Sequence, residues 1–226
     1  MIDQALIFAA GFGKRLQPLT LTTPKPLIDL NGKPLIQYAL DRLNSAGIKK
    51  TVVNTHYLAE QLHDYLKDKN VIISHEPEIL ETGGGLLNAL PNFKPEPILC
   101  LNSDIWWQEN HGSILKNLIK AWDDQTMDIL LILVTQKNAL YFKGPGDFDW
   151  NKETLIPTFR QGDSAPFIYT GIQIIHPRVF VGQESGCFSI VDIYHKVAKS
   201  NRLRALELDG TWCDIGTLDA LESLRR

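Results

Sequence analysis

The residues best suited to chemistry in this sequence follow its first apolar run. Gly11 and Gly13 come directly after an apolar stretch at residues 5–9, Arg15 follows at once, and Lys25 stands between two prolines. A glycine-rich turn at the carboxyl end of a strand can offer several backbone N–H groups to an anion, because no Cβ blocks close approach. Arg15 and Lys25 could neutralise the remaining charge. The stretch therefore predicts a polyphosphate site.

Two glycines after a strand are a weak signal on their own, because the same residues could form only a tight turn. The loop is not a Walker A sequence, which requires G-x-x-x-x-G-K-[ST], and it lacks the third glycine of the dinucleotide fingerprint. Any phosphate site here must therefore be of another type.

Two aspartates are candidate metal ligands. Asp104 directly follows an apolar stretch at residues 97–102, and ligands of open parallel sheets bind beyond the carboxyl ends of the strands. Asp214 lies in the sequence Trp-Cys-Asp-Ile-Gly-Thr, which indicates a tight, packed turn. Mg²⁺ prefers one or two carboxylates together with phosphate oxygens and water. Each aspartate could instead cap a helix, and the residues alone leave that alternative open.

A run of three glycines follows Glu81 and Thr82. Consecutive glycines are poor material for helices and strands, so we expect a loop whose backbone can approach a flat base edge. Glu76, a few residues upstream, could accept a hydrogen bond from a base N–H group. It could equally be a solvated surface acid.

The composition is that of an ordinary globular protein. Hydrophobic residues make up 44% and charged residues 22%, and the formal net charge of -3 is spread without runs. The charge pattern favours neither nucleic acid nor a membrane as a partner. The three cysteines are far apart, which indicates reduced thiols rather than a disulfide framework or a zinc site. The first apolar run is too short for a signal peptide, so we expect a cytoplasmic protein. We also expect a monomer or a weak dimer.

Strands and helices alternate through the first two thirds of the chain, which predicts an α/β fold with βα units on a mainly parallel sheet. We expect one domain over residues 1–226. Turn clusters at residues 138–167 predict hairpins inserted at one edge of the sheet. The expected strands are at residues 5–9, 50–54, 71–75, 97–102, 128–135, 167–175 and 203–208, and the expected helices at residues 34–47, 58–66, 114–122, 190–199 and 218–224.

The sequence Gly-x-Gly-x-Arg, followed by Leu-x-Pro-Leu-Thr and Thr-Pro-Lys-Pro-Leu, resembles the signature of the sugar-phosphate nucleotidyltransferases. The resemblance implies a Rossmann-like three-layer sandwich with a mixed, mainly parallel central sheet. It also implies a transfer of a nucleoside monophosphate from a nucleoside triphosphate to a sugar 1-phosphate, with release of pyrophosphate. The family carries an aspartate at a strand end and another in a Trp-x-Asp-x-Gly-Thr turn, so Asp104 and Asp214 are expected to hold Mg²⁺ jointly.

The resemblance further implies a role for each residue of the loop. Arg15 is expected to hold the leaving pyrophosphate, and Lys25 is expected to stabilise charge that grows on the α-phosphate. The residues expected to bind substrate are Ala10, Gly11, Gly13, Glu76, Thr82, Gly83, Asn102, Asp147 and Gly171.

Some positions depart from the family pattern. Glu81 and Gly83 replace residues of its Gly-Thr-Ala-Gly sequence, and its Glu-Lys-Pro sugar motif is missing, which argues against ordinary hexose recognition. The Glu-Thr-Gly-Gly-Gly and Asn-x-Asp-x-Trp sequences resemble short members that transfer UMP from UTP to N-acetylmuramate 1-phosphate. Alternatives are glucose or mannose 1-phosphate, or phosphocholine, with another nucleotide. Outside enzymes, the alternative is a regulatory protein that binds a nucleotide sugar.

Overall fold

A nine-stranded sheet forms the centre of the computed structural model, which describes residues 2–225; Met1 and Arg226 lie outside the described residues. Its strand order is β10-β9-β11-β6-β1-β4-β5, with β8 paired to β11 and β12 paired to β8. The strands are β1 (Gln4–Phe8), β4 (Lys50–Thr55), β5 (Val71–His75), β6 (Ile98–Asn102), β8 (Ile129–Thr135), β9 (Phe148–Trp150), β10 (Pro157–Phe159), β11 (Phe167–Ile175) and β12 (Leu203–Glu207).

The sheet is mixed and its central strands are parallel. β1 pairs in parallel with both β4 and β6, and β4 pairs in parallel with β5. β11 runs antiparallel between β6 and β8, while β12 is parallel to β8. The residues of β6 and β8 are apolar on both faces, as strands must be when helices cover both sides of a sheet. The expectation of a mixed, mainly parallel sheet is confirmed.

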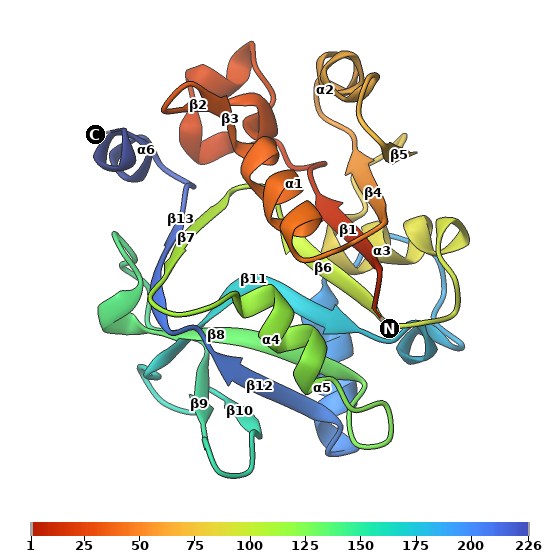
Figure 1. Ribbon diagram of the computed structural model, residues 1–226, viewed down its shortest axis with the longest axis vertical. Helices are drawn as coiled ribbons and strands as arrows, with labels where there is room; N and C mark the ends of the chain where they lie inside the picture. The colour runs from red at the N-terminus through yellow and green to blue at the C-terminus, as the bar shows by residue number, and fades with distance from the viewer. Residues whose placement is uncertain (1, 226) are drawn as a thin grey trace.

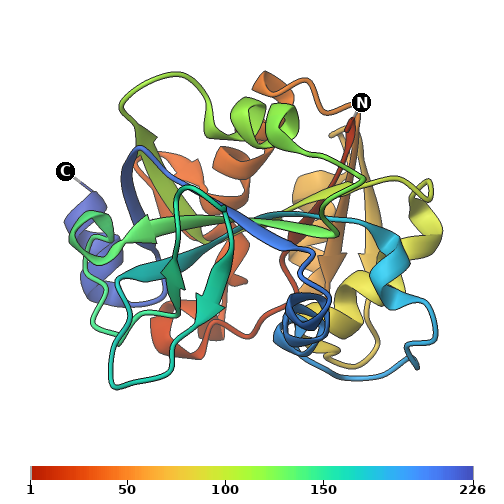
Figure 2. The ribbon, with the colours of Figure 1, turned by 90° about the horizontal axis from the view of Figure 1, so that it is seen from below.

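Helices on both faces of the sheet make three layers (Figures 1 and 2). α1 and α4 cover one face, and α3 and α5 cover the other. Ile36 of α1 and Leu118 of α4 belong to one buried cluster, whereas Leu86 of α3 and Tyr194 of α5 belong to a second. Within residues 2–225, no helix is long and apolar enough to cross a membrane. The helices are α1 (Leu35–Ser45), α2 (Ala59–Leu66), α3 (Glu81–Ala89), α4 (Ile114–Ala121), α5 (Ile190–Lys199) and α6 (Leu218–Leu224).

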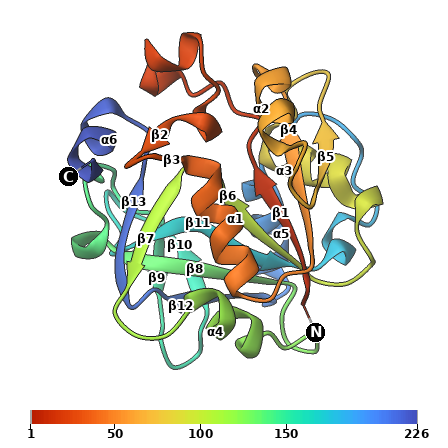
Figure 3. The ribbon, with the colours of Figure 1, turned by 45° about the horizontal axis from the view of Figure 1, so that its top comes forward.

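A two-stranded antiparallel ladder lies beside the main sheet, formed by β7 (Ile105–Glu109) and β13 (Gly210–Asp214) (Figure 3). The expectation of a simple turn around residue 214 is therefore wrong for the residues of β13. Trp107 and Trp212 face each other in the ladder and are almost completely buried. A segment this short becomes a strand only because it pairs with a partner far away in the sequence.

The glycine run is helical, so the expectation of a loop there is wrong. All three glycines, Gly83, Gly84 and Gly85, lie within α3 and are buried. A Cβ on Gly84 would lie 2.0 Å from the carbonyl oxygen of Gly186, and one on Gly83 would lie 2.4 Å from the ring of Phe188. Close packing against the segment before α5 thus outweighs the low helix propensity of glycine.

The inserted region contains one hairpin, β9 with β10, joined to β11 through the pair Phe148 and Phe167. β8 pairs with β11 at both ends of that strand, so β8 occupies one edge of it. β6 and β9 must therefore share the other edge. Because β6 runs antiparallel to β11 and pairs with residues 172–175, the hairpin lies beyond the carboxyl end of β6.

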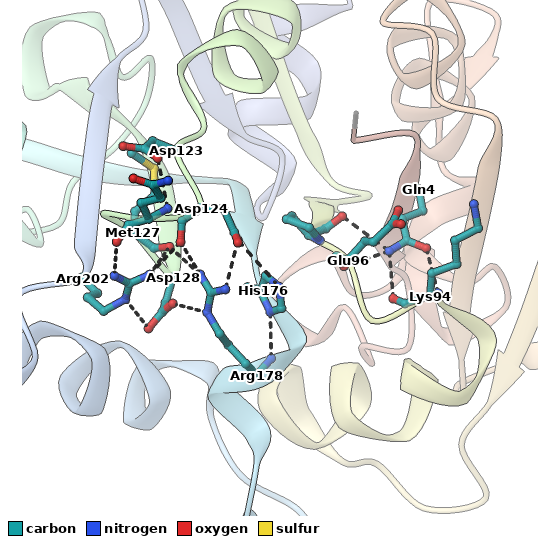
Figure 4. A network of polar contacts seen from close by, with 12 residues as sticks. Gln4, Lys94, Glu96, Asp123, Asp124, Met127, Asp128, His176, Arg178 and Arg202 are labelled. Atoms are coloured by element: carbon teal, nitrogen blue, oxygen red, sulfur yellow. Dashed lines mark hydrogen bonds and ion pairs between the residues drawn. The ribbon is translucent and has the colours of Figure 1, made fainter.

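A charged network ties β8 and β12 together at their amino ends (Figure 4). The carboxylate of Asp128 accepts hydrogen bonds from Arg178 Nε at 2.6 Å and is paired with Arg202 Nε at 2.9 Å. Both arginines also donate to the carbonyl oxygen of Met127. The adjacent Arg178 guanidinium lowers the pKa of the Asp124 carboxyl. This network lies at the amino ends of β8 and β12, whereas ligands of such sheets bind beyond the carboxyl ends of the strands. Its role is therefore structural.

Candidate active site

A cleft of about 200 Å³ opens at the carboxyl ends of β1 and β6. It is lined by the end of β1, by the loop that follows, and by the amino end of α3. This is the edge of the sheet at which parallel α/β folds bind ligands. Of the residues expected from the sequence to bind substrate or metal, those that line it are Ala10, Gly11, Lys25, Thr82, Asn102 and Asp104.

Four charged side chains from three separate segments meet beside this cleft. Lys25 Nζ is hydrogen-bonded to Asp104 Oδ2 and lies 3.8 Å from Asp214 Oδ1. Arg15 Nη2 lies 3.0 Å from the other oxygen of Asp214. The Lys25 side chain is only 11% exposed, whereas the Arg15 side chain is 66% exposed. The structure therefore brings together the two basic and two acidic residues that the sequence singled out.

The loop after β1 folds back on itself to place Lys25. Gly13 has a left-handed backbone with φ of 63°. A Cβ on Gly13 would lie 2.8 Å from Thr20 Cγ2 and 3.0 Å from Lys25 Cβ. The hydroxyl of Thr20 donates to the carbonyl of Gly13 at 2.9 Å. A glycine is thus required at position 13 both for its backbone angle and for the close approach of Lys25.

The β7–β13 ladder places the two aspartates. Asp214 pairs in register with Ile105, the residue after Asp104, and the N–H of Ile215 donates to the Asp104 carbonyl at 2.9 Å. A Cβ on Gly216 would lie 2.5 Å from Arg15 Nη2 and 2.8 Å from Asp214 Oδ2. The glycine of the Trp-x-Asp-x-Gly-Thr sequence therefore leaves room for the ion pair.

The donor set of this site fits Mg²⁺. Two carboxylates, those of Asp104 and Asp214, flank one ammonium group, so they already create a position that attracts positive charge. Among residues 2–225, no group of three or more His, Cys, Asp or Glu side chains is placed to hold a metal ion. Two carboxylates suit Mg²⁺, which takes its remaining ligands from phosphate and water. The same set is too small for a closed zinc site.

The position of Glu76 matches neither expectation from the sequence, which were an acceptor for a base N–H group and a solvated surface acid. Its side chain has no exposed surface, so it is not a surface acid. One carboxylate oxygen accepts from Asn54 Nδ2 at 2.6 Å and the other from the Leu80 N–H at 3.1 Å, so neither points at a base in the cleft. Burial raises the pKa of the Glu76 carboxyl. A Cβ on Gly85 would lie 2.6 Å from Oε1, so the glycine run makes room for this acid.

Asn54 is a site residue that the sequence analysis missed. Its side-chain amide donates to Glu76, while its Oδ1 accepts from the N–H of Ala9 at 2.7 Å. Ala9 is the first residue after β1 and lines the cleft. Glu76 therefore orients Asn54, and Asn54 holds the start of the glycine-rich loop. The available signal was a polar residue near the end of the β-branched stretch at residues 50–55.

Replacing Glu76 by glutamine should change how stability depends on pH. A raised pKa means that ionisation is harder in the folded chain, so the free energy of unfolding of the wild type falls as pH rises above about 4.5 towards the folded-state value. Glu76→Gln lacks this titration and keeps only one acceptor oxygen for two donors, Asn54 Nδ2 and the Leu80 N–H. The stability advantage of the wild type should therefore be larger at pH 4.5 than at pH 8, measured by urea unfolding. Glu78→Gln, an exposed change in the same loop, is the control, and an equal pH dependence in both variants would contradict this assignment.

Besides Gly13 and Glu76, three more of the expected substrate-binding residues do not line the cleft: Gly83, Asp147 and Gly171. The N–H of Gly83 donates to the Phe188 carbonyl at 3.0 Å, which fixes α3. Gly171, with φ of 80°, lies against the side chain of Asn102, and Asp147 accepts from the N–H of Tyr169 at 2.9 Å. Arg15 and Asp214 line an adjoining cavity of about 400 Å³.

Comparisons with known proteins agree on the family. The nucleotidyl transferase family model matches residues 4–156. N-acetylmuramate alpha-1-phosphate uridylyltransferase of Caulobacter vibrioides is 33% identical, over 94% of this chain and 91% of the relative. The protein of the same name from Neisseria meningitidis serogroup B is 32% identical, over 97% of this chain and 95% of the relative.

A solved structure gives the same answer at the level of the fold. A UDP-glucose pyrophosphorylase complexed with UDP-glucose superposes with a TM-score of 0.81 at 21% identity, covering 100% of this chain and 97% of the other. The sequence resemblance is therefore confirmed, and the chain belongs to the nucleotidyl transferase family.

Proposed function

We propose that the protein transfers UMP from UTP to N-acetylmuramate 1-phosphate, yielding a UDP-sugar and pyrophosphate in a Mg²⁺-dependent reaction. The observation that carries this proposal is the meeting of Arg15, Lys25, Asp104 and Asp214 beside the glycine-rich loop. Support for the acceptor and the base comes from the two uridylyltransferases that match nearly the whole chain.

The chemistry needs positioning and neutralisation more than proton transfer. An oxygen of the acceptor phosphate attacks the α-phosphorus, the bond from that phosphorus to the bridging oxygen of the β-phosphate breaks, and the electron pair leaves with pyrophosphate. The acceptor is already an anion, so no general base is required. Backbone N–H groups of Gly11 and Gly13 would cradle the triphosphate, Arg15 would hold the pyrophosphate, and Lys25 would stabilise charge on the α-phosphate.

Asp104 and Asp214 would hold the metal ion, which when bound neutralises phosphate charge near the reacting atoms. The same two carboxylates keep Arg15 and Lys25 at the cleft, because each cation is paired with at least one of them. Lys25, whose side chain is almost buried, is thus held without the cost of an unpaired charge. The ion pairs keep both cations in place before substrate arrives.

A panel of nucleotides and acceptors tests the proposal. Purified protein with Mg²⁺ is offered each of UTP, GTP, CTP and dTTP with N-acetylmuramate 1-phosphate, N-acetylglucosamine 1-phosphate, glucose 1-phosphate, mannose 1-phosphate or phosphocholine, and pyrophosphate release is followed. UTP with N-acetylmuramate 1-phosphate should give the highest kcat/KM. A higher value with another pair would replace these substrates, and tight nucleotide binding without turnover on any acceptor would favour a regulatory protein.

A further inference from the structure

A second cavity, of about 330 Å³, lies between the β9–β10 hairpin, the start of β11 and α5. We call it the hairpin cavity. It is lined by Asp147 and Phe159 of the hairpin region, by Tyr169 of β11, and by Arg160 and His195. Its volume falls within the range of small-molecule sites in proteins.

The hairpin cavity lies next to the cleft that holds Asp104. Gly171 lies against Asn102 at the end of β6, and Tyr169, which lines the hairpin cavity, is two residues before Gly171 on β11. Phe8, which lines the cleft, and Tyr169 pack against the same buried cluster, so both sites open on one face of the sheet.

α3 and α5 also connect the two sites. The hydroxyl of Thr82, which lines the cleft, accepts from the N–H of Ile190 at 3.1 Å. Val191, the next residue, lines the hairpin cavity. A ligand whose phosphate lies near Asp104 would therefore place its sugar over Asn102 and towards the hairpin.

Arg160 is a cation without a carboxylate partner among the residues that the structure describes. Its Nε donates to the Gly146 carbonyl at 3.1 Å and its Nη1 to the Gly162 carbonyl at 3.0 Å. These two bonds fix the guanidinium plane and leave Nη2 without a bond to residues 2–225. By contrast, Arg42 and Arg178 are paired with acids. A guanidinium fixed in this way is suited to a carboxylate ligand.

Of the described residues that line the hairpin cavity, Asp147 is the one acid. Its Oδ2 accepts from the N–H of Tyr169, and it makes no ion pair with Arg160. Neutral hydroxyl groups are suitable donors to its second oxygen. The cavity thus offers an acceptor for sugar hydroxyls and, separately, a cation for an acid group.

We propose that the hairpin cavity holds the sugar of the acceptor and that Arg160 binds a carboxylate on that sugar, which selects acidic sugar 1-phosphates. The proposal rests on the proposed function, because N-acetylmuramate carries a lactyl ether whose carboxylate is ionised at neutral pH. Arg160 acts here on specificity and not on the reacting phosphates.

Arg160→Gln tests the proposal with two acceptors that differ only in charge. N-acetylmuramate 1-phosphate is compared with its lactyl amide, and KM and kcat are measured for each with saturating UTP. We expect the variant to raise KM for the acid about 10-fold, the range for a hydrogen bond to a charged group, while KM for the amide and for UTP changes less than about twofold. Arg204→Gln is the matched control, because that arginine also donates to two backbone carbonyls but lies on β12.

Each other outcome has a distinct meaning. An equal rise in KM for acid and amide would overturn the proposal, since Arg160 would then contact a part that both acceptors share. Equal KM values of the wild type for acid and amide would overturn it too. A wild type that uses glucose 1-phosphate but not N-acetylmuramate 1-phosphate would overturn the proposed acceptor itself. Equal melting temperatures of Arg160→Gln and Arg204→Gln show that the kinetic change is not caused by unfolding.

Discussion

Asp104→Asn should lower kcat/KM at least about 100-fold, or about 2.7 kcal/mol of transition-state stabilisation, while the protein stays folded. The variant keeps the shape of the side chain but removes one of the two carboxylates at the cleft. It thereby weakens the hold on a divalent ion and leaves Lys25 with Asp214 alone, 3.8 Å away. Pyrophosphate release under saturating Mg²⁺ measures the loss.

Asp41→Asn is the matched control for this prediction. Asp41 also forms an ion pair with a lysine, Lys33, at 2.7 Å, but its side chain is 47% exposed and lies on α1. Exposed pairs contribute little to stability, so this variant should keep wild-type activity. If Asp104→Asn retained activity within threefold of the wild type, the metal-binding role of Asp104 would be rejected.

Gly84→Ala should lower the free energy of unfolding by up to about 2 kcal/mol. The new methyl group would lie 2.0 Å from the carbonyl oxygen of Gly186, a backbone atom that cannot rotate away. Either α3 or the segment before α5 must move, and overpacking of this kind costs about 1 to 3 kcal/mol. The higher intrinsic helix propensity of alanine offsets only about 1 kcal/mol. Urea unfolding at neutral pH measures the change.

Gly162→Ala separates this effect from a general effect of replacing glycine. Gly162 has no neighbouring atom within 4 Å of an added Cβ and an ordinary backbone angle, so the variant should be as stable as the wild type or slightly more so. A Gly84→Ala protein as stable as Gly162→Ala would show that α3 can shift without cost.

The parts of the fold that the sequence predicted have local causes. Residues 129–134 are a continuous apolar run, and residues 35–45 repeat apolar side chains at helical spacing, so each segment specifies its own structure. The glycine-rich loop after β1 could be singled out for the same reason, because its glycines and cations follow one another within a short stretch. The hairpin region was marked by its turn residues.

The parts that could not be predicted depend on partners far away in the sequence. β7 and β13 are strands because they pair with each other, and neither has a strong pattern alone. The glycine run is helical because Phe188 and the Gly186 carbonyl pack against it. Glu76 is buried because Asn54 and the Leu80 N–H satisfy its oxygens. Each of the three cases depends on at least one partner that is 22 or more residues away in the sequence.

The β7–β13 ladder also has a consequence for protein synthesis. A nascent chain that has left the ribosome only as far as residue 200 already contains β1, β6 and the glycine-rich loop, but it lacks β13 and with it Asp214. Such an unfinished polypeptide has one of the two carboxylates that we propose to hold the metal ion, and no strand to hold β7. Translation order therefore delays the complete charge cluster until almost the whole chain has emerged, so partial translation products should not consume nucleotide.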